Sequence, residues 1–304
     1  MSIWKHQNLG DIAEKYRLTL GEGFTPLSNE IIDGIDVTFK HEQTNPNGSF
    51  KDRSLAYQLS HYLSEGKRSF VISSSGNAAI SAAAYARLKG LELTVFVAEK
   101  INRQKLAKLE SLQNKQIKLI KSKQPKSDAI KFAGANAVVN LRGSVDEHAV
   151  MGFKTVAYEL LDKFPSLDSV FVACSSGTSA TGIALGFKEA NRTDVQLHIC
   201  QTGYIHPIAK EFDTNFKEEE DSMADAIVDR VARRKNKLIE LVKASGGSGW
   251  VITDTGLRLA HEAANQKGSL KGMSYNSLLP LAGLRKALVS GFNLKNPVVI
   301  LSGT

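Results

Sequence analysis

The sequence of 304 residues has no run of about 18 apolar residues, the length that a membrane-spanning helix needs. Its first residues, Met1 to His6, also lack the charged-then-apolar pattern of a secretory signal. We therefore expect no membrane partner and predict a cytoplasmic protein. The hydrophobic fraction of 42% and the charged fraction of 23% are ordinary for a globular chain, and the length suffices for two lobes.

Cysteine is scarce, and histidine shows no useful spacing. Cys174 and Cys200 are the two cysteines, and both lie in apolar runs that predict buried strands. Free buried thiols are the expected state in a reducing cytoplasm, where disulfides are rare. The seven histidines have no metal-ligand spacing, so we predict no catalytic metal.

The sequence also lacks several motifs that would explain its net charge of +8. It has no zinc-finger spacing and no aromatic-rich basic strand, so a nucleic-acid partner is not expected. The lysines are densest from Lys100 to Lys131, and residues 101–126 suggest an extra helix and strand inserted in one lobe. The acidic segment 212–221 is expected to be a solvated loop. Small phosphorylated or carboxylated ligands suit the charge equally well.

What the sequence does contain is a regular alternation of short apolar runs with helical patterns. Such alternation predicts an α/β fold with mostly parallel sheets covered by helices on both faces. The expected strands are Val37–Lys40, Ser69–Ser73, Leu91–Val97, Gln116–Ile120, Ala137–Leu141, Ser169–Cys174, Val195–Gln201 and Val298–Leu301. The clearest expected helices are Ser54–Glu65, Ala78–Lys89, Glu147–Lys163 and Thr181–Glu189.

A turn followed by a helix start contains the first notable lysine. Residues 45–48 include Asn, Pro and Gly and predict a turn, after which Ser49 is expected to cap a helix. Lys51 then falls in the first turn, where a cation opposes the helix dipole and burial beside Phe50 favours the neutral amine. A neutral amine is the nucleophile that attacks a carbonyl carbon. An ordinary surface lysine after a turn would look the same, so Lys51 alone decides nothing.

A second signal is the loop Ser74, Ser75, Gly76 and Asn77, which follows the expected strand Ser69–Ser73. A polar loop between a strand and an alanine-rich helix presents backbone N–H groups and hydroxyls that can bind a carboxylate. It also stands at the carboxyl end of a strand, where ligands of open α/β sheets usually bind. An ordinary capped turn is the competing interpretation.

The third signal comprises Ser175, Ser176, Gly177, Thr178 and Ser179, which lie between an apolar strand and a helix. Small hydroxyl residues around a glycine form a cup that can hold a phosphate dianion. The pattern is neither the dinucleotide fingerprint nor the P-loop, which disfavours a nucleotide site. No G-x-S-x-G elbow occurs, which disfavours a serine hydrolase.

Taken together, these segments resemble motifs of the fold-type-II pyridoxal-phosphate enzymes (tryptophan synthase β-like), and of the threonine synthase-like branch in particular. Leu20–Leu27 is similar to that family's Glu-Gly-x-Thr-Pro-Leu motif, and Asn47–Arg53 is similar to its cofactor-lysine motif. Ile300–Thr304 resembles the family's terminal strand. The motifs occur in the family's order, from about Trp4 onward.

The resemblance implies a cofactor, pyridoxal 5'-phosphate, and a role for each motif. Lys51 would carry the cofactor as a Schiff base, and its freed amine would be the general base for the α-proton. Asn77 would bind the cofactor's ring oxygen, and the loop Ser74–Asn77 the substrate carboxylate. Ser175–Ser179 would hold the phosphate. Ser302 would face the pyridine nitrogen, and a neutral hydroxyl there makes a milder electron sink, which favours expulsion of a leaving group.

Which reaction the resemblance implies stays open. Trp4 with Gly21–Gly23, and Gly152–Ala157, favour a threonine synthase acting on phosphohomoserine. However, Gly143–His148 stands where that branch has an Asn/Asn-Pro/Arg segment, and no tail follows Thr304. The cup is closer to those of cysteine synthases and dehydratases. We therefore predict a pyridoxal-phosphate-dependent lyase for an amino acid with a β- or γ-leaving group. The alternatives are a serine/threonine dehydratase or a cysteine synthase-like enzyme and, remotely, a non-catalytic basic binding protein.

The resemblance also predicts the domain organisation and the partners. Residues 1–54 and 150–304 are expected to form a large cofactor-binding domain. Residues 55–149 would form a smaller, mobile domain for the substrate carboxylate. The partners would be an amino-acid substrate, phosphorylated in the threonine synthase reaction, and a second copy of the chain in a homodimer.

Overall fold

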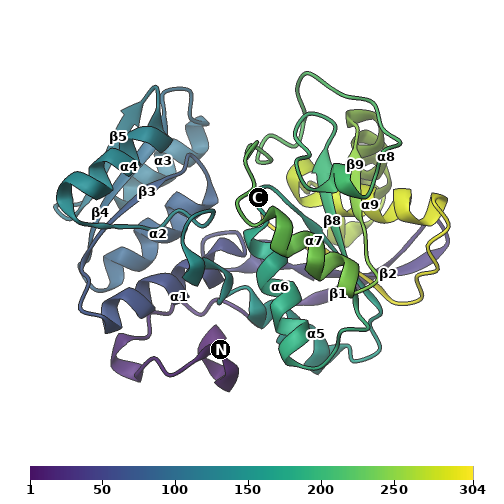
Figure 1. The fold of residues 1–304 in the computed structure, drawn as a ribbon, viewed down its shortest axis with the longest axis horizontal. Helices are drawn as coiled ribbons and strands as arrows, with labels where there is room; N and C mark the ends of the chain where they lie inside the picture. The colour runs from purple at the N-terminus through teal and green to yellow at the C-terminus, as the bar shows by residue number, and fades with distance from the viewer. Residues whose placement is uncertain (304) are drawn as a thin grey trace. The chain divides into compact units, whose positions relative to one another are not determined.

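The computed structural model describes residues 1–303 and divides them into two compact units. The first unit consists of Met1–Phe24 and Asn45–Gly152, and the second of Thr25–Thr44 and the chain from Phe153 onward. Each unit contains its own sheet and its own hydrophobic core. Figure 1 shows the elements of both units with the labels used below.

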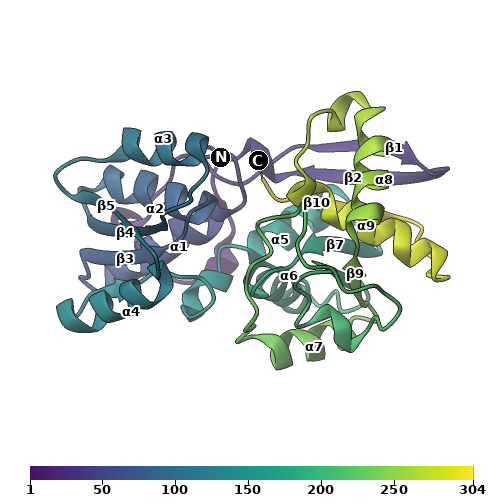
Figure 2. The same cartoon turned by 90° about the horizontal axis from the view of Figure 1, so that it is seen from above.

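The sheet of the first unit has four parallel strands in the order β5-β4-β3-β6. Their bounds are Ser69–Ser73 for β3, Glu92–Ala98 for β4, Ile117–Ser122 for β5 and Val139–Asn140 for β6. The helices of this unit are α1 (Lys51–Ser64), α2 (Asn77–Leu88), α3 (Arg103–Leu112) and α4 (Pro125–Asn136). Helix α2 packs on the sheet between α1 and α3, and α4 covers the opposite face (Figure 2).

The sequence explains this packing. Strands β3 and β4 are apolar almost throughout, as expected for parallel strands covered on both faces. The small side chains of α2, mostly alanines, let this helix approach the sheet closely. The larger core lies on the α2 face, and a smaller cluster around Val71, Phe96 and Ala129 lies beneath α4.

The second unit is built on a six-stranded sheet in the order β1-β2-β10-β7-β8-β9. The strands are β1 (Leu27–Ile32), β2 (Ile35–His41), β7 (Ser169–Ala173), β8 (Gln196–Thr202), β9 (Gly249–Ile252) and β10 (Pro297–Leu301). Strand β1 is antiparallel to β2, and the remaining pairs are parallel.

Helices cover this second sheet as well. They are α5 (Lys154–Lys163), α6 (Thr178–Glu189), α7 (Lys235–Ala244), α8 (Asp254–Asn265) and α9 (Tyr275–Val289). Helix α9 lies against β7 to β10 with α8 packed on it, while α5, α6 and α7 pack side by side. Short 3-10 helices occupy Ile3–Lys5, Gln7–Leu9, Glu14–Tyr16, Glu42–Thr44, Glu147–Val150, Ala209–Glu211 and Gly268–Leu270.

Both sheets reverse their strand order at one place. Successive strands β3, β4 and β5 extend to one side of β3, and β6 then pairs on its other side. In the second sheet β7, β8 and β9 extend to one side of β7, and β10 pairs on the other. Ligands of open α/β sheets bind outside the carboxyl ends of the strands at such a reversal. The loops that follow β3 and β7 therefore occupy the favoured ligand position of their own sheets.

The predicted fold class is confirmed, but the structure divides the chain at other residues than predicted. Residues 1–24, 45–54 and 150–152, expected in the large domain, belong to the first unit, and Lys51 is among them. The ring of Trp4 stacks on Tyr57 of α1 with 5.9 Å between centroids. The Leu18 N–H donates to Ser60 Oγ of the same helix at 2.7 Å. These contacts join residues far apart in sequence, so no local pattern could reveal them.

Three further expectations need correction. The helix and strand within 101–126 exist, but they form a regular βαβ unit that ends in edge strand β5 and are not an insertion. The expected helix Glu147–Lys163 is interrupted between Val150 and Lys154. The acidic segment 212–221 is not simply solvated, because Asp213 is buried and accepts hydrogen bonds from the Val251 N–H and from Lys286.

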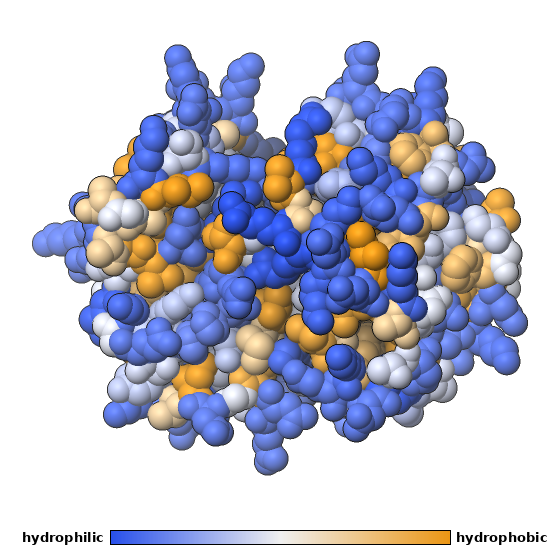
Figure 3. All heavy atoms as spheres, in the orientation of Figure 1, coloured by the Kyte–Doolittle hydropathy of each residue, from blue (hydrophilic) through white to orange (hydrophobic). Residues whose placement is uncertain are grey.

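The helices and the surface have the following properties. Among the helices of residues 1–303, none is both long and apolar enough to cross a membrane. On the face seen in Figure 3, hydrophilic residues predominate and apolar ones are scattered.

Cys174 and Cys200 are buried thiols that form no disulfide in the described residues, as predicted. A Cβ at Gly283 of α9 would lie 2.1 Å from Cys200 Sγ, so this glycine allows α9 to touch β8.

A fully buried histidine lies in the core of the second unit. His198 of β8 stacks on Phe171 with 4.3 Å between ring centroids, and its Nδ1 accepts the Trp250 Nε1–H at 3.1 Å. Burial lowers the pKa of His198 to about 3. The His198 ring is therefore neutral in the folded protein at neutral pH.

This histidine makes the fold sensitive to acid. The unfolded chain protonates His198 near pH 6.5 and the folded chain only near pH 3, so its contribution to stability is complete above pH 6.5 and falls below it. We expect this residue to account for a loss of about 2 kcal/mol between pH 8 and pH 5. Urea denaturation of the wild type and of His198→Phe at both pH values measures it. An equal loss of stability in both proteins would contradict the assignment.

Candidate active site

Lys51 is the first residue of α1 and follows a tight turn. The Gly48 N–H donates to the Asn45 carbonyl at 2.8 Å, and Gly48 has φ +88°, a conformation that favours glycine. Phe50 already has helical backbone angles, and Ser49 Oγ accepts the Lys51 N–H at 3.3 Å. The N-cap is therefore Phe50 and not Ser49 as the sequence predicted, although the Ser49 hydroxyl does accept the N–H of the first helical residue.

Asp52 fixes the loop that leads to Lys51. Its carboxylate accepts the Asn47 N–H at 2.7 Å and the Asn47 side-chain amide at 2.9 Å. Burial raises the pKa of Asp52, and the hydrogen bonds from Asn47 oppose this shift. Lys108 of α3 donates to the Asn47 carbonyl at 3.0 Å from the other side. The turn before Lys51 is therefore held by charged groups from two helices, a role that the sequence alone did not assign to either residue.

The Lys51 side chain is half-buried, with Nζ 4.6 Å from the centroid of the Phe50 ring. The ring face favours the cation, whereas the first turn of a helix disfavours it. The Phe50 ring and the helix start therefore have opposite effects on the charge of the Lys51 amine. Because the linker from Ser64 to Ser69 is short, α1 runs antiparallel to β3, and Lys51 lies toward the carboxyl edge of the first sheet.

The backbone of α1 packs directly against residues 149–152, the last residues of the chain that belong to the first unit. A Cβ built on Gly152 would lie 2.0 Å from the Arg53 carbonyl oxygen and 2.9 Å from the Ser54 nitrogen. The Ser54 hydroxyl donates to the Ala149 carbonyl at 2.7 Å. Only glycine permits this approach, which sets the position of the helix turn that begins with Lys51.

The loop Ser74–Asn77 links β3 to α2 as predicted, and α2 begins at Asn77. The Ser75 hydroxyl accepts the Ala98 N–H of β4 at 2.8 Å, and the Ser74 hydroxyl accepts the Gly76 N–H at 3.2 Å. No side chain caps α2 at its N-cap, Gly76. The first N–H groups of a helix have no intrahelical acceptor, so this turn suits a carboxylate.

The cup Ser175–Ser179 links β7 to α6, and Gly177 gives it its shape. Gly177 has φ +90°, and a Cβ there would lie 3.1 Å from a Leu238 methyl carbon. The hydroxyls of Ser176 and Thr178 are 2.9 Å apart. The Ser175 hydroxyl accepts two backbone N–H groups, from residues 228 and 229, at 3.1 and 3.2 Å. It can still donate its own proton, because a hydroxyl carries one donor and two acceptor sites.

A buried amide holds the cup in place, and sequence reasoning missed it. Gln201 of β8 donates from Nε2 to the carbonyls of Cys174 and Ser175 at 3.2 and 3.3 Å. Its Oε1 accepts the N–H groups of Ile208 and Ala209 at 2.8 and 2.7 Å. The one available signal was a polar residue in a buried strand, directly after the apolar pair Ile199 and Cys200.

Ser302 directly follows β10, which is the neighbour of β7 in the sheet. The two strands are parallel, so Ser302 and the cup lie at the same sheet edge. Gly303, the next residue, accepts a short hydrogen bond from the Ser277 hydroxyl and donates its N–H to the same oxygen at 3.2 Å. Thr304 lies outside the described residues.

The structure thus groups the predicted site residues within each unit. Lys51 and the loop Ser74–Asn77 stand at helix starts of the first unit. The cup and Ser302 stand at adjacent strand ends of the second unit. Within residues 1–303, no group of three or more His, Cys, Asp or Glu side chains is arranged to hold a metal ion.

A family model described as "Pyridoxal-phosphate dependent enzyme" matches residues 18–303 of this sequence. The chain belongs to this family. Its curated relatives include a threonine synthase of Halalkalibacterium halodurans, 28% identical over 292 residues that cover 93% of this chain and 82% of the relative. A threonine synthase of Methanocaldococcus jannaschii is 25% identical over 312 residues, covering 96% and 76%.

Solved structures of this pyridoxal-phosphate fold are also similar. Maize serine racemase aligns with a TM-score of 0.79 and 18% identity, covering 92% of this chain and 87% of that one. Serine racemase from Dictyostelium discoideum aligns with a TM-score of 0.78 and 16% identity, covering 100% and 98%. At such identities the likeness shows the fold. The predicted family, fold type and cofactor, pyridoxal phosphate, are confirmed.

The cup has the chemistry that the cofactor's phosphate requires. Thr181 Oγ1, in the first turn of α6, is buried and has no hydrogen-bond partner among residues 1–303. An unsatisfied buried hydroxyl costs free energy unless a ligand or water completes it. Together with the hydroxyls of Ser176 and Thr178 and the first N–H groups of α6, it forms a donor set that fits a phosphate dianion. The residues present therefore fit this group.

Proposed function

We propose that this pyridoxal-phosphate enzyme eliminates or replaces a β- or γ-leaving group on an amino acid, with phosphohomoserine as the named candidate substrate. The observation that carries this proposal is the similarity to threonine synthases along nearly the whole chain. Two of these relatives cover 93% and 98% of it, at 28% and 24% identity. The family match over residues 18–303 includes Lys51, the loop Ser74–Asn77 and the cup Ser175–Ser179.

In this proposal Lys51 has two roles. Its Nζ holds the cofactor between turnovers and, once released, takes the proton from Cα of the substrate. The bound cofactor supplies an electron sink for the carbanion that remains. The turn fixed by Asp52 and by the close contact at Gly152 sets where this amine stands. Positioning within hydrogen-bonding reach is what makes such proton transfer efficient.

The other loops bind and orient. The loop Ser74–Asn77 would bind the substrate carboxylate with backbone N–H groups, and Asn77 would bind the ring oxygen of the cofactor. The cup Ser175–Ser179 would hold the cofactor phosphate. Ser302 would place a neutral hydroxyl, instead of a carboxylate, at the pyridine nitrogen. Such a partner does not enforce protonation of the ring, which favours loss of a leaving group over amino transfer.

A two-substrate assay tests this function. We expect the purified holoenzyme to release inorganic phosphate from phosphohomoserine, measured with a colorimetric phosphate assay. It should form little ketoacid from serine or threonine, measured by coupled reduction of the ketoacid. The reverse result would support the dehydratase alternative, and the absence of both products would contradict a catalytic role on these substrates. The homodimer and the cytoplasmic location stay predictions.

A further inference from the structure

The positive charge of this protein is concentrated in one part of the first unit. Residues 100–131, which we call the basic edge, contain ten lysines and arginines but two acids, Glu110 and Asp128, and so carry a net charge of +8. This equals the net charge of the whole chain, so the remaining residues contain as many acids as cations. A charge that served only solubility would need no such concentration.

The basic edge surrounds the last strand of a sheet. It forms α3, β5 and α4, and β5 is the edge strand of the four-stranded sheet. Helix α3 lies on one face of this sheet and α4 on the other (Figure 2). Lys118 and Lys121 of β5 are both exposed, and because they are three positions apart their side chains point to opposite faces. Cations therefore lie on both faces of the sheet along this edge.

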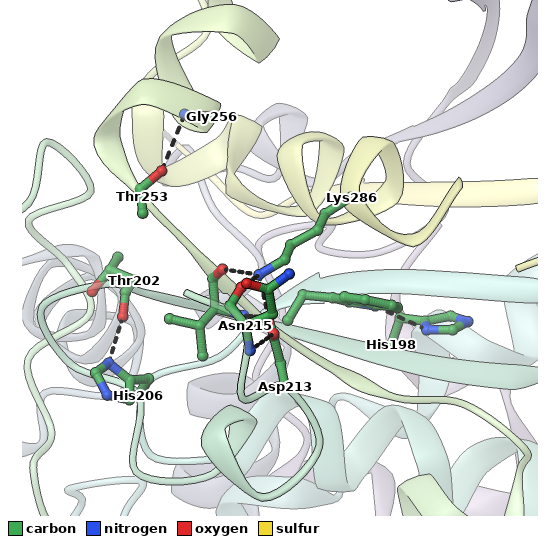
Figure 4. A network of polar contacts seen from close by, with 10 residues as sticks. His198, Thr202, His206, Asp213, Asn215, Thr253, Gly256 and Lys286 are labelled. Carbon is green, nitrogen blue, oxygen red and sulfur yellow. Dashed lines mark hydrogen bonds and ion pairs between the residues drawn. The ribbon is translucent and has the colours of Figure 1, made fainter. Parts of the chain in front are cut away.

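The described part of the chain does not neutralise this charge. Seven exposed cations form no ion pair with a carboxylate among residues 1–303: Lys100, Arg103, Lys115, Lys118, Lys121, Lys123 and Lys131. Of the two acids, Asp128 accepts the Ser122 hydroxyl instead. In the second unit, by contrast, Lys286 donates to the Asp213 carboxylate at 2.6 Å (Figure 4). The cations of the basic edge can therefore bind an anionic partner.

The outer side of β5 also offers backbone hydrogen bonds. The Leu93 N–H of β4 donates to the Gln116 carbonyl, which shows that the even-numbered residues of β5 direct their backbone groups to β4. These groups alternate along a parallel strand, so Leu119 and Lys121 direct their N–H and C=O outward. No strand of the described chain pairs there, because β5 ends its sheet. Such an edge is a template for another extended chain.

The composition of the basic edge favours a peptide over a nucleic acid. It contains no aromatic side chain on which bases could stack. Ile120 of β5 is 39% exposed and offers an apolar contact, which suits a side chain better than a phosphate. Lysines on an edge strand repel basic strands, whereas they attract a strand that carries carboxylates. The strand geometry and the charge thus select the same kind of partner.

We propose that the basic edge binds an extended acidic segment of a partner protein, which pairs with β5 as a fifth strand of the first sheet. Backbone hydrogen bonds to β5 hold the segment, and Lys118 and Lys121 select carboxylates on its two faces. This surface belongs to the first unit alone and includes none of the residues assigned to the cofactor or the substrate. The proposal is therefore independent of the reaction that the enzyme catalyses.

A peptide-binding measurement on the holoprotein tests the proposal. The probe is a fluorescein-labelled octapeptide of alternating glutamate pairs and valine pairs, which has carboxylates on both faces when extended. Fluorescence anisotropy is recorded at about 0.1 M salt, where charges more than about 10 Å apart are screened. We expect Lys118→Glu combined with Lys121→Glu to weaken binding about tenfold or more, because two attractive charge pairs become repulsive.

A charge-matched double variant is the control. Lys163 and Lys271 are exposed residues of the second unit. Lys163→Glu combined with Lys271→Glu changes the net charge equally and should alter the affinity by less than about twofold. Equal weakening in the two double variants overturns the proposal, as does a wild-type protein that does not bind the peptide. Circular dichroism spectra equal to that of the wild type show that both variants are folded.

Two further probes test the strand pairing and the class of partner. A peptide with the same glutamates but with proline in place of every valine keeps the charge and loses half of the N–H donors. We expect it to bind at least about tenfold more weakly than the valine peptide. Equal affinities of the two peptides overturn the proposal, because charge alone then accounts for binding. A short DNA duplex that binds more tightly than the valine peptide overturns it in favour of a nucleic-acid partner.

Discussion

Lys51→Ala is expected to lower turnover by about 10³-fold or more and to remove the visible absorbance of the lysine-bound cofactor. Alanine can neither hold the cofactor covalently nor accept the α-proton, so both proposed roles of Nζ are lost. The fold should persist, because Lys51 is half-buried and stands at the first residue of α1. Absorbance spectra of the purified protein with added cofactor, together with steady-state rates, measure the effect.

A matched lysine provides the control. Lys67 is exposed and lies in the same unit, between α1 and β3. Lys67→Ala should keep the absorbance band and the wild-type rate. If the band survives in Lys51→Ala and disappears from another lysine variant, the assignment of the cofactor lysine is wrong. A far-UV circular dichroism spectrum equal to that of the wild type separates loss of chemistry from loss of fold.

Gly152→Ala is expected to destabilise the first unit by about 3 kcal/mol or more. The added methyl group would lie 2.0 Å from the Arg53 carbonyl oxygen, which is backbone and cannot rotate away. Either the segment 149–152 or the first turn of α1 must move. Because that turn begins with Lys51, we also expect weaker cofactor binding. Urea denaturation followed by circular dichroism, and a cofactor titration, measure the two effects.

Gly134→Ala is the control for this substitution. Gly134 lies within α4, and a Cβ there would have no atom within 4 Å. Alanine is the better helix former, so this variant should be stabilised by about 0.5–1 kcal/mol. A Gly152→Ala protein as stable as the wild type would show that the contact with α1 is loose. It would also remove the argument that this glycine positions Lys51.

Much of the fold follows from the local sequence. Strand β3 has the predicted bounds, and α2 starts within one residue of its prediction, because continuous apolar runs and alanine-rich stretches suffice to define them. Strand β1 was not predicted, although Asp33-Gly34 is a strong hairpin signal. Both turn residues have positive φ, as a type I′ turn requires. The polar residues of this edge strand concealed the alternation that marks a strand.

In the candidate site, the sequence placed the motif residues but not the residues that support them. Motif residues such as Lys51 and Asn77 could be placed at helix starts from the sequence, because turn residues and apolar runs bracket them. The residues that hold these loops in position could not be identified from the sequence. Gln201, for example, bonds to residues on two other loops, and its partners are defined only by the order of the strands. The hydrogen bonds that residues 228 and 229 donate to Ser175 have the same origin.

The sequence by itself determined the fold class, the motif order and the family, since these depend on local patterns of apolar, small and polar residues. Only the tertiary structure decided which side chains support the motifs. It assigned residues 1–24 to the first unit, packed Gly152 on α1 and brought the backbone of residues 228 and 229 to Ser175. The physical reason is that such contacts join positions tens of residues apart, whose proximity arises from strand order and core packing. Neither leaves a periodic signal in the chain.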